Sequence, residues 1–85
     1  MSVKKNPGYI SKTLCHDRSY IYLYDRSKMY DDKQISPRWE IEHEGGSKIY
    51  IQSRDKARKI AKRIAAIKEP IEDMQVLMDH IRSQP

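Results

Sequence analysis

The stretch RWEIEHEGGSKIYIQ, residues 38–52, decides the fold, because its spacing fixes how two strands can pair. Apolar and polar residues alternate on both sides of Gly45 and Gly46, which is the pattern of a β-hairpin. A turn made of the two glycines alone would place Ile49 and Ile51 on the same face as the glutamates of the first strand. Neither face of that hairpin would be apolar, so the sequence favours a longer loop.

A three-residue loop over residues 44–46, with one glycine in the left-handed position, gives the hairpin one apolar face. We predict this register, because one face can then be buried while the other meets water and carries a charge-matched pair. The opposed residues are Trp39 with Ile51 and Ile41 with Ile49 on the apolar face, and Glu40 with Tyr50 and Glu42 with Lys48 on the polar face.

A further strand is predicted upstream in SYIYLYD, residues 19–25, which is β-branched or aromatic at nearly every position. Side chains alternate between the two faces of a strand, so Ile21 and Leu23 share one face. The other face carries the tyrosines at positions 20, 22 and 24.

The segments around this strand carry weaker signals. Residues 1–8, MSVKKNPG, have two lysines and a turn signal but no periodicity, and are expected to form a flexible basic arm. Residues 26–37 form a polar connection that closes at Pro37. Residues 9–18 have no pattern that assigns them, and a strand there could cover the edge of the sheet.

The first of two predicted helices runs over residues 54–68. Ser53 is a plausible N-cap, and Asp55 lies in the first turn, where a negative charge suits the helix dipole. Its apolar residues recur at helical spacing and fill one stripe, which we expect to pack on the sheet: Ala57, Ile60, Ala61, Ile64 and Ile67.

The second helix is predicted over residues 70–82. Pro70 disfavours helical geometry at the preceding residue and can itself open a helix, with Glu72 and Asp73 in the first turn. The predicted stripe consists of Ile71, Met74, Leu77, Met78 and Ile81.

These elements predict one α+β domain over residues 1–85, with a small antiparallel sheet of about three strands (residues 19–52) and two C-terminal helices on one face. Its core is thin, because a chain this short buries only about 60% of the surface exposed when unfolded. The order of three strands and a helix resembles the arm-binding domains of tyrosine-type integrases, in element order only. SRDKARKIAKRIAAI, residues 53–67, is similar to the second helix of double-stranded RNA-binding domains and departs from it at Arg54 and Asp55.

The composition indicates a globular protein, with 38% apolar and 34% charged residues. The single cysteine, Cys15, cannot form an internal disulfide, and the reducing cytoplasm fits best. The sequence has no stretch resembling a signal peptide and no apolar run that reaches the ~18 residues of a spanning helix. We therefore expect a cytoplasmic protein with no membrane association.

The residues that usually carry catalysis or bind metals do not form a recognisable pattern. His16, His43 and His80 lie far apart, and Cys15 beside His16 lacks the paired spacing of a zinc site. No nucleophile motif or glycine-rich phosphate loop is present. We expect no enzyme activity, no catalytic residues, no metal and no cofactor.

The net charge of +5 is concentrated in residues 53–68, which carry seven basic residues and one acid. Like charges on one helix side repel unless an anionic partner neutralises them, and an ordinary solvated helix mixes signs at four-residue spacing. We therefore expect a nucleic acid, DNA or RNA, to bind this helix through its phosphates. The predicted contacts are Lys56, Arg58, Lys59, Lys62 and Arg63, with Lys4 and Lys5 as an auxiliary arm.

The alternative hypothesis is a small regulatory or inhibitory protein that docks on a larger partner. If Ile21 and Leu23 lie beneath the helices, a row of tyrosines emerges on the open face, and tyrosine favours protein interfaces. Glu40 and Glu42 share this face and would repel a phosphate backbone. The predicted interface residues are Tyr20, Tyr22, Tyr24 and Tyr50. We expect the protein to be a monomer or a weak homodimer.

Overall fold

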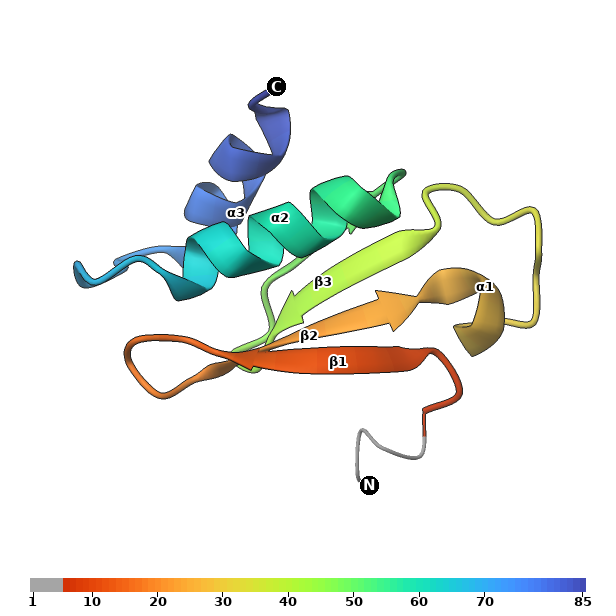
Figure 1. The fold of residues 1–85 in the computed structure, drawn as a ribbon, viewed down its shortest axis with the longest axis horizontal. Helices are drawn as coiled ribbons and strands as arrows, with labels where there is room; N and C mark the ends of the chain where they lie inside the picture. Colours follow the sequence, from red (N-terminus) through yellow and green to blue (C-terminus); the bar gives the residue numbers. More distant parts are fainter. Residues whose placement is uncertain (1–5) are drawn as a thin grey trace.

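The computed structural model describes residues 6–85, and it confirms an α+β fold with two C-terminal helices (Figure 1). Four strands form one antiparallel sheet in the order β1-β2-β3-β4, so that strands adjacent in the sequence are also neighbours in the sheet. The elements are β1 Tyr9–Leu14, β2 Tyr20–Asp25, α1 Arg26–Met29, β3 Trp39–His43, β4 Lys48–Ile51, α2 Arg54–Ala65 and α3 Met74–Ser83.

The hairpin register predicted for β3 and β4 is confirmed. All four opposed pairs form as expected, including Trp39 with Ile51 and Ile41 with Ile49. The loop has three residues, because the His43 N–H donates to the Ser47 carbonyl at 2.8 Å. Gly46 has φ +109°, a conformation that a residue without a Cβ adopts at little cost.

The expectation of about three strands was low by one, because part of the unassigned segment 9–18 forms β1. The strand was hard to recognise because its pairing with β2 shifts between Tyr9 and Ser11, which interrupts the alternation of its side chains. In addition, Ser11 and Thr13 lie on the helix-covered face, where an apolar residue is usual. Beyond the bulge, β1 therefore lacks the apolar face that identifies a half-buried strand.

The predicted flexible arm over residues 1–8 is wrong for residues 6–8. Gly8 N–H donates to the Asn6 side chain at 2.8 Å, and the Gly8 carbonyl accepts from Asp25 N–H at 2.7 Å. Gly8 also lies so close to Met29 and the Asp25 carbonyl that a Cβ would collide with both. Lys4 and Lys5, the predicted auxiliary contacts, lie outside the described residues.

The connection over residues 26–37 contains the short helix α1, which sequence patterns did not indicate. Asp25 caps it, accepting from Ser27 N–H at 3.0 Å. The Asp25 carboxylate also accepts from Arg38 Nε at 3.1 Å and Nη2 at 2.9 Å, in a two-pronged ion pair. Asp25 is only 1% exposed, so these bonds replace its lost hydration and hold α1 against the end of β2.

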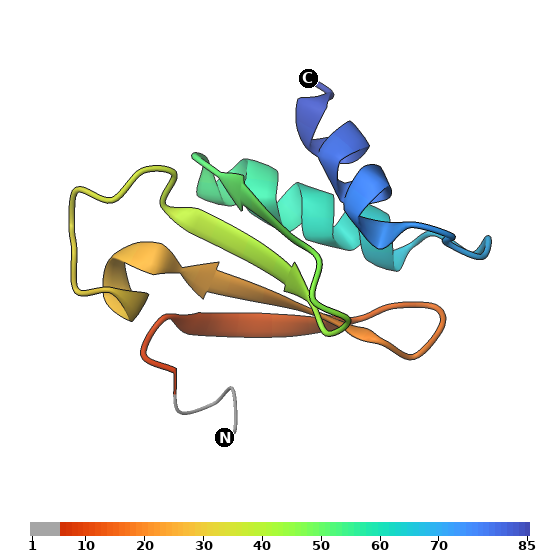
Figure 2. The same cartoon turned by 180° about the vertical axis from the view of Figure 1, so that it is seen from behind.

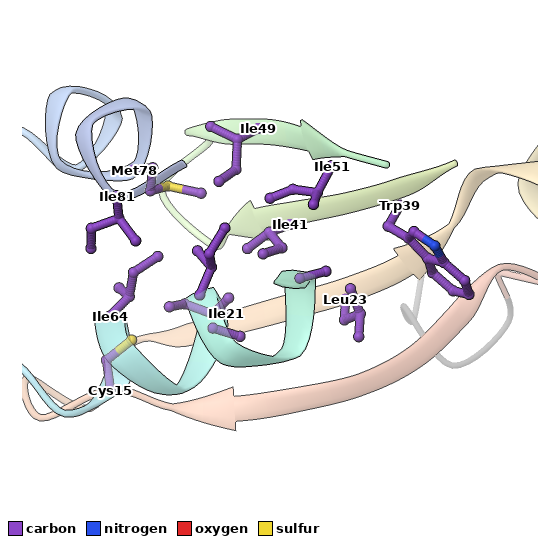
Figure 3. Close-up of a cluster of buried hydrophobic side chains, with 13 residues drawn as sticks. Cys15, Ile21, Leu23, Trp39, Ile41, Ile49, Ile51, Ile64, Met78 and Ile81 are labelled. Carbon is purple, nitrogen blue, oxygen red and sulfur yellow. The ribbon is translucent and has the colours of Figure 1, made fainter. Parts of the chain in front are cut away.

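The core lies between the sheet and the two long helices (Figure 3). As predicted, Ile21 and Leu23 of β2 point toward the helices and are buried. The other face carries neither long helix; in Figure 2 it is turned forward and α2 lies behind the strands. We call it the open face. The core side chains are Cys15, Ile21, Leu23, Trp39, Ile41, Ile49, Ile51, Ala57, Ile60, Ala61, Ile64, Met78 and Ile81.

Both predicted helices are shorter than expected. The first begins at Arg54 with Ser53 as its N-cap, as predicted, but it ends at Ala65 instead of residue 68. Ile67 N–H bonds to the Ile64 carbonyl at 3.2 Å, so a tightened last turn takes Ile67 out of the helix while its side chain still packs on the core.

The second helix begins at Met74, and the prediction that Pro70 opens it was wrong. Asp73 acts as the N-cap and accepts from Val76 N–H at 3.2 Å. The acids expected inside its first turn therefore lie before the helix. α3 also contacts the outer edge of the sheet, because the Gln75 amide bonds both the N–H and the carbonyl of Lys48 in β4, at 3.0 and 2.9 Å.

The buried Asp25 ion pair predicts an acid-dependent loss of stability. Its bonds with Arg38 lower the pKa of Asp25 from 3.8 to about 2. A lowered pKa stabilises the fold above the unfolded value, and this contribution disappears as pH falls from about 4 to about 2. We expect Asp25→Asn to lower the free energy of unfolding by about 2 kcal/mol at neutral pH. The variant should also show a weaker fall of this free energy as pH drops from about 4 to about 2.

Urea unfolding measured across that pH range checks this prediction. Glu69→Gln, which removes a carboxylate from an exposed loop residue, is the matched control and should unfold like the wild type. An Asp25→Asn protein with the wild-type acid dependence would contradict the prediction.

Candidate nucleic-acid interface

α2 is held in place by its cap and by its apolar stripe. The Ser53 hydroxyl accepts from Lys56 N–H at 3.3 Å, which fixes the first turn. Ala57, Ile60, Ala61 and Ile64 are buried against the sheet and α3. Because these positions recur every three or four residues, the opposite side of the helix must face solvent.

That solvent side carries the five predicted contacts, which we call the basic face: Lys56, Arg58, Lys59, Lys62 and Arg63. All five are exposed, and within residues 6–85 none forms an ion pair. Asp55 is the one acid in α2. The basic face thus presents its positive charge to solvent without internal compensation.

The basic face divides into two sides around the helix. Lys56, Lys59 and Arg63, together with the acid Asp55, line a groove of about 350 Å³ between α2 and the C-terminal end of α3. Arg63 is steadied there, because its Nη2 donates to the Gln84 side chain at 2.6 Å. We call the three basic residues the α3 flank.

The remaining two basic residues lie on the other side. Arg58 and Lys62 line a hollow of about 130 Å³ between α2 and the strands, together with the polar side chains Ser11 and Thr13 of β1. We call this pair the β1 flank. Sequence reasoning found all five residues but not their division, because it depends on where α3 and β1 lie beside the helix.

The four predicted tyrosines all belong to the open face, but they are not equally accessible. Tyr20 and Tyr22 are half-buried, and Tyr50 is 37% exposed. The prediction that Tyr24 is exposed was wrong, because it is 3% exposed and the Tyr9 ring packs edge-on against it at 6.3 Å. Tyr9 comes from β1, the strand that sequence analysis did not assign.

The two glutamates predicted to make the open face acidic are partly compensated. Glu42 lies 3.7 Å from Lys48 Nζ in an ion pair. Glu40 is 3% exposed, and burial raises its pKa. The open face consequently repels anions less than the sequence suggests.

Arg26 was not identified from sequence. Its guanidinium lies over Tyr50, with Cζ 4.6 Å from the ring centroid, and 5.8 Å from that of Tyr30. Nη1 donates to the Pro37 carbonyl at 2.7 Å, while the buried Nε has no hydrogen-bond partner among the described residues. No local sequence pattern relates positions 26 and 50, because the two residues come together only through the side-by-side pairing of β2, β3 and β4 in the sheet.

Asp17, Ser19 and His43 have the residue types of a hydrolytic triad, but their hydrogen bonds run in the wrong order. Gly45 N–H donates to His43 Nδ1 at 3.1 Å, which assigns the ring proton to Nε2. Nε2 then donates to Ser19 Oγ at 2.8 Å, and that hydroxyl donates to Asp17. A histidine that donates to serine cannot act as its base. These hydrogen bonds therefore connect the β1–β2 loop to the end of β3, and they do not activate a nucleophile.

The described residues contain no group of three or more side chains suited to a metal ion. Cys15 is buried, and burial raises the pKa of its thiol, which disfavours the reactive thiolate.

No protein-family model, curated protein or solved structure matches this chain.

The burial of Tyr24 predicts an alkaline limit to stability. Burial raises its pKa from 10 to about 12, so the folded protein holds this proton after the unfolded chain has lost it. The resulting contribution to the free energy of unfolding is present below pH 10 and disappears as pH rises toward 12, which lowers stability by roughly 2 kcal/mol. We expect Tyr24→Phe to weaken this dependence.

Denaturant unfolding between these two pH values tests the assignment. Tyr30→Phe is the control, because Tyr30 is an exposed tyrosine. Equal alkaline slopes in the two variants would contradict the role of Tyr24.

Proposed function

We propose that the protein is a small non-enzymatic nucleic-acid-binding protein that contacts phosphates through the basic face of α2. The observation that carries this proposal is the set of five exposed basic side chains with no ion-pair partner among residues 6–85. Three basic residues elsewhere in the described structure pair with acids, namely Arg38, Lys48 and Arg82, whereas others such as Lys12 and Lys28 do not. The basic face is therefore distinguished by the number of positive charges gathered on one helix. An excess of one sign on a single helix is the usual electrostatic footprint of a phosphate-binding protein.

The groove beside the α3 flank also supports the proposal. It gives three basic side chains and one acid, Asp55, a shared concave surface, in which a bound phosphate can meet several donors at once. Among residues 6–85, the helices lack the combination of length and apolar character that a membrane span requires.

A second candidate function is docking on a protein partner through the open face. It is favoured by the absence of a long helix over this face and by the exposure of Leu14 and Tyr50, at 54% and 37%. Half-buried Tyr20 and Tyr22 continue this surface.

Phosphate contact predicts binding that weakens steeply with salt. We expect Lys59→Gln with Arg63→Gln to reduce the slope of log affinity against log salt by about 2, because each lost contact removes roughly one released counterion. Fluorescence polarisation with labelled DNA and RNA, from low to physiological salt, measures this slope. Lys28→Gln with Lys33→Gln is the matched control, since it removes the same charge from two exposed lysines, one in α1 and one in the loop after it.

The outcome separates local contact from overall charge. Equal losses in the two double variants would show that net charge, and not the basic face, governs binding. An unchanged slope in Lys59→Gln with Arg63→Gln would also contradict the proposal.

Docking through the open face makes a different prediction. Tyr22→Ser with Tyr50→Ser should abolish a protein complex while leaving nucleic-acid affinity unchanged, because neither tyrosine borders α2 or its grooves. A pull-down alongside circular dichroism, to confirm folding, checks this prediction. A complex that persists in the folded variant would exclude the open face as the docking site.

A further inference from the structure

The division of the basic face carries information about the shape of the ligand. In a helix with 3.6 residues per turn, Lys56 and Arg63 project in nearly the same direction from the helix axis, and Arg58 projects well over a quarter-turn away from them. The α3 flank opens into one groove and the β1 flank into a separate hollow. The positive charge therefore lies along both sides of α2, and a matching ligand has phosphates on both sides of a helix-wide gap.

We propose that the ligand is B-form duplex DNA, with α2 lying in its major groove and one phosphate backbone along each flank. This inference rests on the proposed function and specifies its substrate. An α-helix with its side chains is about 10–12 Å across, and the B-DNA major groove is about 12 Å wide. The twelve residues of α2 make a rod of about 18 Å, which covers roughly five base-pair steps.

The position of α2 leaves this side of the molecule open. Figure 1 shows α2 in front of the sheet, between α3 and β1, with no other element drawn before it. In Figure 2 the strands lie in front of α2. The tyrosines of β2 alternate with Ile21 and Leu23, which point toward the helices, so they occupy the opposite face of the sheet. A duplex can approach the basic face without meeting the sheet.

The same geometry argues against other nucleic acids. The major groove of A-form RNA is deep and narrow and does not admit a helix. A single strand has one backbone and would use one flank while leaving the other uncompensated. It also could not stack its bases on Tyr20 and Tyr22 while bound to α2, because the sheet separates them.

The ridge of α2 between the flanks would face the base edges. Asp55 lies on this ridge, between the two flanks. A carboxylate accepts from the amino group of cytosine. The ridge therefore favours G·C-containing sites over A·T tracts.

The experiment compares four probes of matched length: a G·C-containing DNA duplex, the RNA duplex of the same sequence, the single DNA strand, and heparin. We expect the DNA duplex to bind tightest at physiological salt. Methyl green, which occupies the major groove, should displace the protein, and netropsin, which occupies the minor groove of A·T tracts, should not.

Two double variants test the flanks separately. Lys56→Gln with Arg63→Gln removes charge from the α3 flank, and Arg58→Gln with Lys62→Gln removes it from the β1 flank. Each should weaken DNA binding by roughly 30-fold at physiological salt, because each removes about two phosphate contacts. Lys28→Gln with Lys33→Gln is the charge-matched control, and circular dichroism verifies folding.

The outcomes distinguish this inference from the proposed function. If the RNA duplex or single strand binds as tightly as the DNA duplex, if methyl green fails to compete, or if one flank has no effect, the major-groove arrangement is overturned while nucleic-acid binding stands. If no nucleic acid binds even at low salt, the proposed function fails and this inference fails with it.

Discussion

The pairing of β3 with β4 is the constraint on which the rest of the structure depends. With Ile41 opposite Ile49 and Trp39 opposite Ile51, a single sheet face becomes apolar and must be covered. A shift of one residue would remove that face and leave the apolar stripes of α2 and α3 without a partner. The orientation of α2, and with it the outward direction of the basic face, therefore follows from a three-residue loop.

The two faces of the sheet consequently have different surroundings. One is sealed by helices, and its polar exceptions, Ser11 and Thr13, lie at the edge beside the β1 flank. The other carries aromatic and charged residues, and Tyr24 and Glu40 are buried on it without a long helix above them. For Tyr24, the Tyr9 ring of β1 packs edge-on against it from the neighbouring strand.

The elements with strong periodicity could be predicted from sequence. The hairpin, the strand carrying Ile21 and Leu23, the Ser53 cap and the basic face all depend on spacing within one segment or between adjacent segments. β1 could not be identified, because a bulge interrupts its alternation and polar residues occupy its covered face. At the start of α3, the Pro70 signal competed with the Asp73 cap, and the side-chain bond to Val76 determined the boundary. The burial of Tyr24 and the two flanks depend on contacts between distant segments, which spacing alone does not encode.

The Gln75 clamp on Lys48 has a consequence for how copies of the chain could associate. Its amide occupies backbone groups that would otherwise be free on β4, whereas β1 pairs on one side only. An unpaired strand edge is where a strand of another chain can add. The clamp obstructs such addition at the Lys48 end of β4, whereas β1 keeps an edge at which a further strand could pair. A single glutamine side chain thus makes the two edges of the sheet unequal.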